Sequence, residues 1–390
     1  MLDWLVVGGG VHGTYLSSLL TTRCGVAADR VRVLDPDPEP LARWYRCAHN
    51  TGMEFLRSPD VHCLGDHPFA LHEFARGDGG RALARFTGPY RNQPSLELFR
   101  AHVDTIVRER GLRALRLRGW ARRLTTVGRG LRVDTDAGAL EARRVVLAIG
   151  STRPAWPDWA RQLRRAGGRI DHIFSRGFCR SSLAPWSRAV VVGGGISAAQ
   201  TALALAADAP GRVTLLSRHE LREEDFDAHP CWFGGCLGSF VRESDLGRRR
   251  SVIRRERNRG SVPPAIAREL WRQVAEDRLD VRFAPVSDAR RLPAGGVRLD
   301  LEEGYGALEA DLVVLATGFD PARPGGAWLD RAIGELGLPR AGCGYPVVDA
   351  TLHWGHGIHL TGPLAELEVG PAARNIIGAR LAVERIAAVA

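Results

Sequence analysis

The stretch "VVVGGGISAAQTALAL" at Val190–Leu205 repeats the plan of "LVVGGGVHGTYLSSLL" at Leu5–Leu20. In both copies a short apolar strand runs into a glycine-rich turn, and a helical stretch follows the turn. A turn of this kind lets the backbone approach a pyrophosphate, which then lies at the positive N-terminus of the helix. The repeat therefore predicts an α/β fold with two Rossmann-like dinucleotide-binding domains.

The first copy carries the G-x-G-x-x-G spacing at Gly8, Gly10 and Gly13. The first glycine makes the tight turn, the second lets the backbone approach the pyrophosphate, and the third lets helix and strand pack closely. The next strand is expected at Val31–Leu34 and ends at Asp35. An acid at this place accepts hydrogen bonds from the ribose hydroxyls of an adenosine. This unit predicts a dinucleotide without a 2′-phosphate, which fits FAD.

The second copy ends in alanine rather than glycine, and its three turn positions are Gly193, Gly195 and Ala198. Alanine at the third position still permits close packing. The next strand, expected at Val213–Ser217, ends in a hydroxyl and is followed by Arg218, where the first copy has an acid. An acid would repel a 2′-phosphate, whereas Ser217, Arg218 and the nearby Arg222 could bind one. This unit predicts NADPH.

Two further strands end in glycine, "RRVVLAIGS" at 143–151 and "ADLVVLATGF" at 310–319, and each follows a stretch with the alternation of a hairpin. The same plan thus occurs twice, and the second domain is expected to be inserted in the first. The boundaries that we expect are 1–152 for the first part of the FAD-binding domain, 153–304 for the NADPH-binding domain, and 305–390 for the second part of the FAD-binding domain.

Three glycines that follow strands are further candidate cofactor contacts: Gly150, Gly318 and Gly362. Pro371 suits the first turn of a helix that would run to about Ala387. The resemblance of the two turns to flavoproteins with two dinucleotide-binding domains implies that the N-terminus of such a helix faces the flavin, where its dipole would stabilise the reduced, anionic form. Pro371 is therefore also a candidate contact.

All 54 basic residues are arginine, since the sequence contains no lysine. The net charge of +10 therefore indicates a bias in residue usage more than a nucleic-acid-binding surface, and no nucleic-acid partner is expected. Without lysine, neither a Schiff base nor a lysine phosphate clamp can form. The seven cysteines show no disulfide framework and no segment resembles a signal peptide, so a cytoplasmic location is expected.

Neither a membrane span nor a metal site is expected. The charge-free run Ala189–Ala207 holds three consecutive glycines and fits a strand–turn–helix better than a span. The histidines of "HWGHGIH" at 353–359 recur every third residue, but no cysteine or acid completes a zinc site at the usual spacing. The sequence leaves open whether the chain forms a homo-oligomer.

The order of GGGVHG, AIGS, GGGISA, LLSR and LATGF resembles the flavoproteins with two dinucleotide-binding domains. More narrowly, it resembles the class B flavin monooxygenases, on the branch of the N-hydroxylating ornithine and lysine monooxygenases. Three stretches carry this narrower resemblance: "DHIFSRGF" at 171–178, "RNRGSVPPAIARELW" at 257–271, and "FLRSPDVHCL" at 55–64 with "QPSLELF" at 93–99. The resemblance implies that His172, Asn258 and Ser261 act near the nicotinamide. It implies a flavin-side role for Arg57, Ser58 and His62.

The resemblance implies an NADPH- and FAD-dependent monooxygenase that N-hydroxylates a small amine or amino-acid-like substrate through a C4a-hydroperoxyflavin. Its partners would be this small molecule and molecular oxygen. Two features of related enzymes are missing. The Baeyer–Villiger signature F-x-G-x-x-x-H-x-x-x-W is absent between Phe174 and Trp186, and the lysine that N-hydroxylases use on the substrate carboxylate cannot be present.

Other chemistries of the same fold stay open. A pyridine-nucleotide–disulfide reductase needs two cysteines against the flavin, and "CWFGGC" at Cys231–Cys236 has a C-x4-C spacing, although it follows the NADPH-binding strand. A ferredoxin or quinone reductase would share the fold without inserting oxygen. A sensor that binds nucleotides without turnover is a further alternative.

Overall fold

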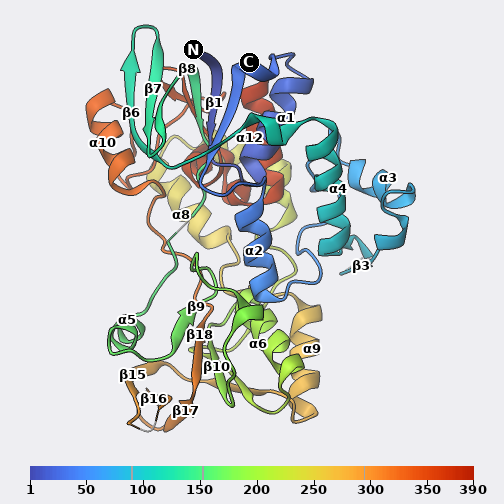
Figure 1. Ribbon diagram of the computed structural model, residues 1–390, viewed down its shortest axis with the longest axis vertical. Coiled ribbons are helices and arrows are strands. Elements are labelled where there is room, and N and C mark those ends of the chain that lie inside the picture. The colour runs from blue at the N-terminus through green and yellow to red at the C-terminus, as the bar shows by residue number, and fades with distance from the viewer. Residues whose placement is uncertain (89–90, 152, 294) are drawn as a thin grey trace.

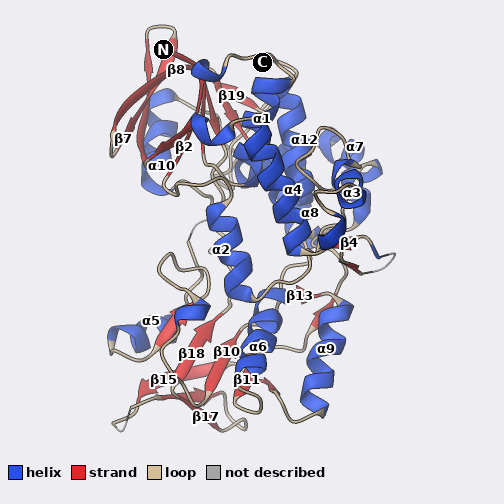
Figure 2. Cartoon of the chain, turned by 45° about the vertical axis from the view of Figure 1, so that its right-hand side comes forward, coloured by secondary structure: helices blue, strands red, loops and turns tan. Residues whose placement is uncertain are grey.

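The computed structural model describes residues 1–88, 91–151, 153–293 and 295–390. Two sheets form the centres of two domains, which lie one above the other in Figure 1. Helix α2 (Ala42–Thr51) runs from the first domain toward the second, as Figures 1 and 2 both show. The side chain of Asn50 near its end donates to the carbonyls of Ile173 and Phe178 at 3.2 and 2.9 Å.

The first sheet has the strand order β19-β20-β8-β1-β2-β5, with the β6–β7 hairpin attached to β8. Residues Trp4–Val7 of β1 are all buried, as expected for a parallel strand covered on both faces. Strand β20 comes from the far end of the chain and pairs in parallel with β8. The strands are β1 (Leu2–Val7), β2 (Val31–Asp35), β5 (Arg116–Arg118), β6 (Ala121–Val127), β7 (Gly130–Thr135), β8 (Gly138–Leu147), β19 (His353–Gly355) and β20 (Ile358–Leu360).

The second sheet has the order β14-β11-β10-β18-β9, and all its pairs are parallel. A three-stranded antiparallel sheet, β15-β16-β17, precedes β18 in the chain. The strands are β9 (Ile170–His172), β10 (Ala189–Val192), β11 (Val213–Ser217), β14 (Asp280–Phe283), β15 (Val286–Arg291), β16 (Val297–Leu301), β17 (Ala307–Ala310) and β18 (Leu312–Leu315). The predicted fold class, two Rossmann-like domains with the second inserted in the first, is confirmed.

The sheets differ from the expected domain boundaries in one place. Strand β18 pairs with β10 from Leu312 to Leu315, so a boundary after residue 304 would cut the second sheet. We therefore propose that the second domain extends through Leu315. The boundary expected at residue 152 lies outside the described residues.

Helices cover both sheets and also connect the two domains. They are α1 (Val11–Thr22), α3 (Ala70–Arg76), α4 (Leu96–Glu109), α5 (Asp158–Arg165), α6 (Ile196–Asp208), α9 (Pro264–Ala275), α10 (Gly326–Leu336), α11 (Glu366–Val369) and α12 (Ile376–Ala387). The expected terminal helix from Pro371 is shorter than predicted. Pro371–Arg374 forms a separate 3-10 helix, η8, and the extended backbone of Asn375 (ψ 173°) divides it from α12.

Residues 228–257 leave the second sheet and pack on the first domain. We call them the helical insertion; they contain η6 (Pro230–Phe233), α7 (Gly235–Arg242) and α8 (Leu246–Glu256). Helices α7 and α8 lie beside the first domain in Figure 2. Trp232, Phe240 and Ile253 share one apolar cluster with Tyr345 and Leu367. The sequence did not indicate this excursion.

An ion-paired carboxylate fastens the helical insertion to the C-terminal segment. Glu366 is 1% exposed and pairs with Arg250 of α8 and with Arg374, whose Nε lies 2.8 Å from Oε2. Arg249 of α8 also pairs with Glu368, at 2.8 Å. Removing one partner from a buried ion pair leaves an uncompensated charge, so these contacts fix where α8 lies.

We expect the stability of the fold to decrease as the pH falls from about 6.5 to about 4. Burial lowers the pKa of five histidines to about 4: His12, His62, His102, His172 and His359. Because the unfolded chain binds protons to these imidazoles at a higher pH than the folded chain does, stability is lost as the pH falls through this window. Each buried histidine contributes up to about 3 kcal/mol.

Urea unfolding at a series of pH values measures this loss. The variant His359→Gln should show a shallower decrease in the unfolding free energy than the wild type. A variant of the exposed His219, His219→Gln, serves as the control and should keep the wild-type slope. An unfolding free energy that stays constant from pH 6.5 to 4.5 would contradict the burial of these imidazoles.

Candidate functional site

The first glycine-rich turn has the geometry of a dinucleotide site. Gly8 has φ +113°, and a Cβ added there would lie 2.5 Å from the carbonyl oxygen of Ala148. A Cβ on Gly13 would lie 1.8 Å from the carbonyl oxygen of Gly8, whereas a Cβ on Gly10 would meet no atom within 4 Å. The open side of Gly10 is where a pyrophosphate would approach, at the N-terminus of α1. These residues fit the adenosine pyrophosphate of FAD.

The carboxylate of Asp35 lies at the end of β2, beside this turn. Its Oδ2 accepts the N–H of Gly9 at 2.6 Å, and its Oδ1 accepts the N–H of Asp37 at 2.8 Å. Oδ2 keeps a further lone pair for a ribose hydroxyl, whereas Oδ1 also faces the guanidinium of Arg116. Arg116, which our reading of the sequence missed, lies 3.3 Å from Asp35 and donates to the carbonyls of Asp37 and Pro38. This guanidinium fixes the loop that follows the acid.

His12 connects the first turn to the C-terminal part of the first domain. Its Nδ1 lies 2.7 Å from the hydroxyl of Thr361, and the next residue, Gly362, is buried with φ +64°. Burial lowers the pKa of His12 to about 4, so the imidazole is neutral. Its Nε2 is buried and has no hydrogen-bond partner among the described residues. The predicted contacts Gly8 and Gly362 thus lie just after strands β1 and β20, and the contact between His12 and Thr361 connects these two strand ends.

The second turn repeats this geometry, with Ala198 in place of the third glycine. A Cβ on Gly193 would lie 2.5 Å from the carbonyl oxygen of Ala316, and Ala198 is fully buried. A Cβ on Gly195 would lie 3.1 Å from Cα of Gly260, so the segment after α8 runs close to this turn. A dinucleotide at this turn would lie next to that segment.

The expected 2′-phosphate contacts are not equivalent in the structure. The hydroxyl of Ser217 is buried and donates to the carbonyl of His219 at 2.6 Å, so it is not free to donate to a phosphate. Arg218 is exposed, and its guanidinium has no hydrogen bond or ion pair within the described ranges. Arg222 instead pairs with Glu224 at 2.8 Å and donates to Asn258 at 2.7 Å. Of the expected contacts, Arg218 is thus the one whose guanidinium is available to bind a phosphate.

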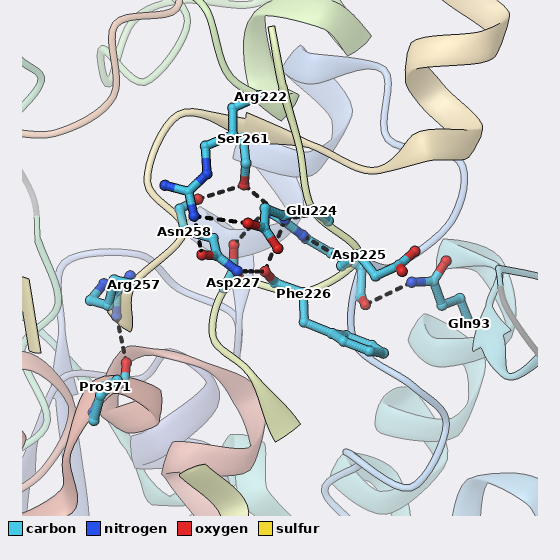
Figure 3. A network of polar contacts seen from close by, with 11 residues as sticks. Gln93, Arg222, Glu224, Asp225, Phe226, Asp227, Arg257, Asn258, Ser261 and Pro371 are labelled. Atoms are coloured by element: carbon cyan, nitrogen blue, oxygen red, sulfur yellow. Dashed lines mark hydrogen bonds and ion pairs between the residues drawn. The ribbon is translucent and has the colours of Figure 1, made fainter. Parts of the chain in front are cut away.

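A polar network joins the predicted residues Arg57, Asn258 and Ser261 at the seam of the two domains. Figure 3 shows Asn258 and Ser261 within this network. Arg57 donates to Ser261 at 2.9 Å and to the carbonyls of Glu224, Asp225 and Phe226, and it pairs with Asp227 at 2.8 Å. Its guanidinium is therefore directed at the second domain. The expected flavin-side role of Arg57 does not fit this position.

Asn258 and Ser261 lie together but are held by their neighbours. The amide of Asn258 donates to Phe226 and accepts from Arg222, and Ser261 donates to the carbonyl of Asn258 at 2.5 Å. Arg257, next in the chain, donates to the carbonyl of Pro371 at 3.0 Å, as Figure 3 also shows. The segment 257–261 thus contacts both the second turn and the C-terminal segment, and its side chains position that segment.

His172 does not lie in an open site. It is fully buried in β9, between Trp156 and Phe174, and its Nδ1 accepts the N–H of Phe174 at 3.1 Å. Its Nε2 lies 3.2 Å from the hydroxyl of Thr317, and burial lowers its pKa to about 4. These contacts argue against the expected catalytic role.

The remaining expected contacts lie at the strand ends and in the loop after α2. Gly150 follows β8, and a Cβ there would meet no atom within 4 Å; Gly318 follows β18 with φ +80°. Ser58 is half-buried, and His62 is buried with its ring 4.9 Å from that of Phe233 in the helical insertion. The expected flavin-side loop therefore contacts the helical insertion.

Cys231 and Cys236 form a disulfide in this insertion. Both are half-buried, and they belong to the apolar cluster that contains Tyr345 and Leu367 of the first domain. The expectation that the pair lies with the second domain is thus wrong, because the insertion packs against the C-terminal part of the first. Within the described ranges, no three histidine, cysteine or acidic side chains gather as a metal site would require, and no helix has the length and apolar character of a membrane span.

The two glycines of the first turn should respond differently to substitution. Gly10→Val should fold normally and lose bound flavin, because Gly10 has φ −76° and open space on the side of the pyrophosphate. Gly13→Val should destabilise the protein by at least about 1–3 kcal/mol, because its side chain would overlap the carbonyl of Gly8. The ratio of flavin to protein absorbance and the thermal midpoint measure the two effects. Full flavin content in folded Gly10→Val would refute the assignment of this turn.

Two family models match the chain. The model described as pyridine nucleotide-disulphide oxidoreductase matches residues 121–362, and the model described as FAD-NAD(P)-binding matches residues 5–152. A search of curated protein sequences gave no significant match.

Solved structures resemble the whole chain. The ornithine N-hydroxylase KtzI of Kutzneria sp. 744, in a complex with FADred, NADP+ and L-orn, has a TM-score of 0.77 at 17% identity, with 100% of this chain and 98% of that chain covered. The ornithine hydroxylase PvdA of Pseudomonas aeruginosa has 0.76 at 18%, with 100% and 98% covered. The bacillithiol disulfide reductase Bdr of Bacillus cereus has 0.62 at 17%, with 100% and 98% covered. The chain shares the fold of the two ornithine hydroxylases. It belongs to the pyridine nucleotide-disulphide oxidoreductase family, as an oxidoreductase built from FAD- and NAD(P)-binding domains.

Proposed function

We propose that the chain is an NADPH- and FAD-dependent monooxygenase that N-hydroxylates a small amine or amino-acid-like substrate. The observation that carries this proposal is the position of the segment 257–261. It contacts Gly195 of the second turn through Gly260 and the C-terminal segment through Arg257. This segment resembles the N-hydroxylase stretch that lies near nicotinamide and substrate, and here it lies between the two dinucleotide-binding domains.

The cofactors supply the redox chemistry, with hydride from NADPH and oxygen activation by FAD. The contribution of the chain is to bind and orient. The glycine-rich turns would hold the two pyrophosphates, and Arg57 fixes the loop 224–227 against Ser261. Asn258 and Ser261 act as positioning residues, since their polar atoms are bonded to protein neighbours.

A panel of amines and amino acids tests this proposal. We expect a substrate to raise NADPH oxidation and oxygen uptake and to yield a hydroxylamine in proportion to the NADPH consumed. The variant Gly195→Val should lose NADPH oxidation while keeping bound flavin, because only the second turn is altered. Gly193 is left unchanged, since a Cβ there would lie 2.5 Å from the carbonyl oxygen of Ala316. NADPH oxidation by purified flavoprotein that yields no hydroxylamine with any amine, and only hydrogen peroxide, would contradict the monooxygenase proposal.

A disulfide oxidoreductase is the second candidate function, because Cys231 and Cys236 form a disulfide next to the C-terminal segment of the first domain. Under the monooxygenase proposal, replacing both cysteines by serine should leave flavin reduction and amine-dependent turnover within about twofold of wild type, since the surrounding cluster stays apolar. The exposed Cys343, replaced by serine, is the control. Stopped-flow reduction by NADPH and steady-state turnover measure this. Loss of turnover in the double variant with flavin still bound would favour the disulfide candidate.

A further inference from the structure

Two guanidinium groups, those of Arg250 and Arg374, pair with one carboxylate where the helical insertion meets the C-terminal segment, and the charges of Arg257 and Arg259 act on this pair from nearby. We call this set the seam cluster, and its members are Arg250, Arg257, Arg259, Arg374 and Glu366. Arg250 lies on α8. The chain then passes Arg257 and Arg259, and the next residue, Gly260, lies beside Gly195 of the second glycine-rich turn. The four positive charges outnumber the negative charge of Glu366, and the carboxylate of Asp227, which also acts on Arg257, is paired with Arg57.

The carboxylate is shared by two of the arginines. Glu366 pairs with both Arg250 and Arg374. Arg374 completes its contacts with the hydroxyls of Ser151 and Tyr345, each at 3.1 Å, which are neutral groups. Arg250 is 8% exposed, and its Nε is buried without a hydrogen-bond partner among the described residues. Glu366 therefore compensates only one of the two charges that it contacts.

Arg257 and Arg259 have no carboxylate of their own in this cluster. Arg257 donates to the carbonyl of Pro371, and the guanidinium of Arg259 has neither a hydrogen bond nor an ion pair in the part of the chain that the structure describes. Burial and the nearby charge of Arg374 lower the pKa of Arg257 to about 10. Burial, Arg374 and Arg250 also lower the pKa of Arg259. Cations that repel one another in this way favour an added anion.

We propose that Arg257, Arg259 and Arg374 form a binding site for an anionic oxygen group, a phosphate or a carboxylate, of a ligand that lies between the two dinucleotide-binding domains. Planar guanidinium groups suit such groups because they donate in pairs. The anion has two possible sources: the pyrophosphate of the dinucleotide bound at the second turn, or a carboxylate of the substrate. Only the second source rests on the proposed function.

Binding measurements on the FAD-loaded protein test this site without turnover. The probes are NADP+, inorganic pyrophosphate and glutarate, each titrated calorimetrically. The variant Arg259→Gln should weaken at least one probe by about tenfold, the effect of losing a charge-assisted contact. Arg255→Gln is the matched control, since Arg255 lies near the end of α8, is exposed like Arg259, and is already paired with Glu256 at 2.7 Å. The control should bind all three probes as the wild type does.

The pattern of loss identifies the source. If Arg259→Gln weakens both pyrophosphate and NADP+, the site binds the dinucleotide, and Arg218→Ala should then weaken NADP+ but not pyrophosphate. If it weakens glutarate and leaves NADP+ unchanged, the site binds a substrate carboxylate. Wild-type affinities for all three probes in Arg259→Gln, or no binding of any probe to the wild type, would overturn the site. Anion binding in a protein that hydroxylates no amine would support this site and refute only the proposed function.

Discussion

A buried carboxylate lies at the centre of the contacts that fix the arrangement of the two domains. Glu366 is 1% exposed and lies between Arg250 of the helical insertion and Arg374 of the C-terminal segment. A buried carboxylate is unfavourable unless cations and hydrogen-bond donors surround it, so Glu366 holds both arginines close to it. The insertion starts and ends in the second domain. Its attachment at Glu366 therefore also fixes the second domain, and the segment after α8, relative to the first.

Arg57 fastens the same seam from the other side. This arginine belongs to the loop after α2, yet its contacts are with Glu224, Phe226, Asp227 and Ser261 of the second domain. The segment 257–261 therefore lies between two arginine-based attachments. The placement of this segment follows from contacts across the domains and not from the sheets themselves. The side chains of Asn258 and Ser261 are accordingly occupied by hydrogen bonds to their protein neighbours.

The local features of this fold could be predicted from the sequence, and the long-range ones could not. Strand Val213–Ser217 has the predicted bounds, because apolar runs bounded by turns are decided by neighbouring residues. The roles of the first-turn glycines also follow from spacing alone. The burial of His172 and the direction of Arg57 depend on residues more than a hundred positions away. The hydroxyl of Ser217 is used by its own loop, a competition that spacing does not reveal.

Every basic residue in the chain is arginine, and the many donors of a guanidinium let a few side chains hold the seam. A guanidinium offers five N–H donors in a plane, whereas an ammonium offers three on one atom. Arg57 uses this capacity to contact three carbonyls, a carboxylate and a hydroxyl at once. Arg249 likewise donates to the carbonyls of Leu367 and Val241 while it pairs with Glu368. In this setting Arg259 differs from its neighbours: the next residue, Gly260, lies beside the second turn, and the guanidinium of Arg259 has no polar partner among the described residues. Arg259 is exposed and makes no such contact, which is why we propose it as a donor to a bound anion.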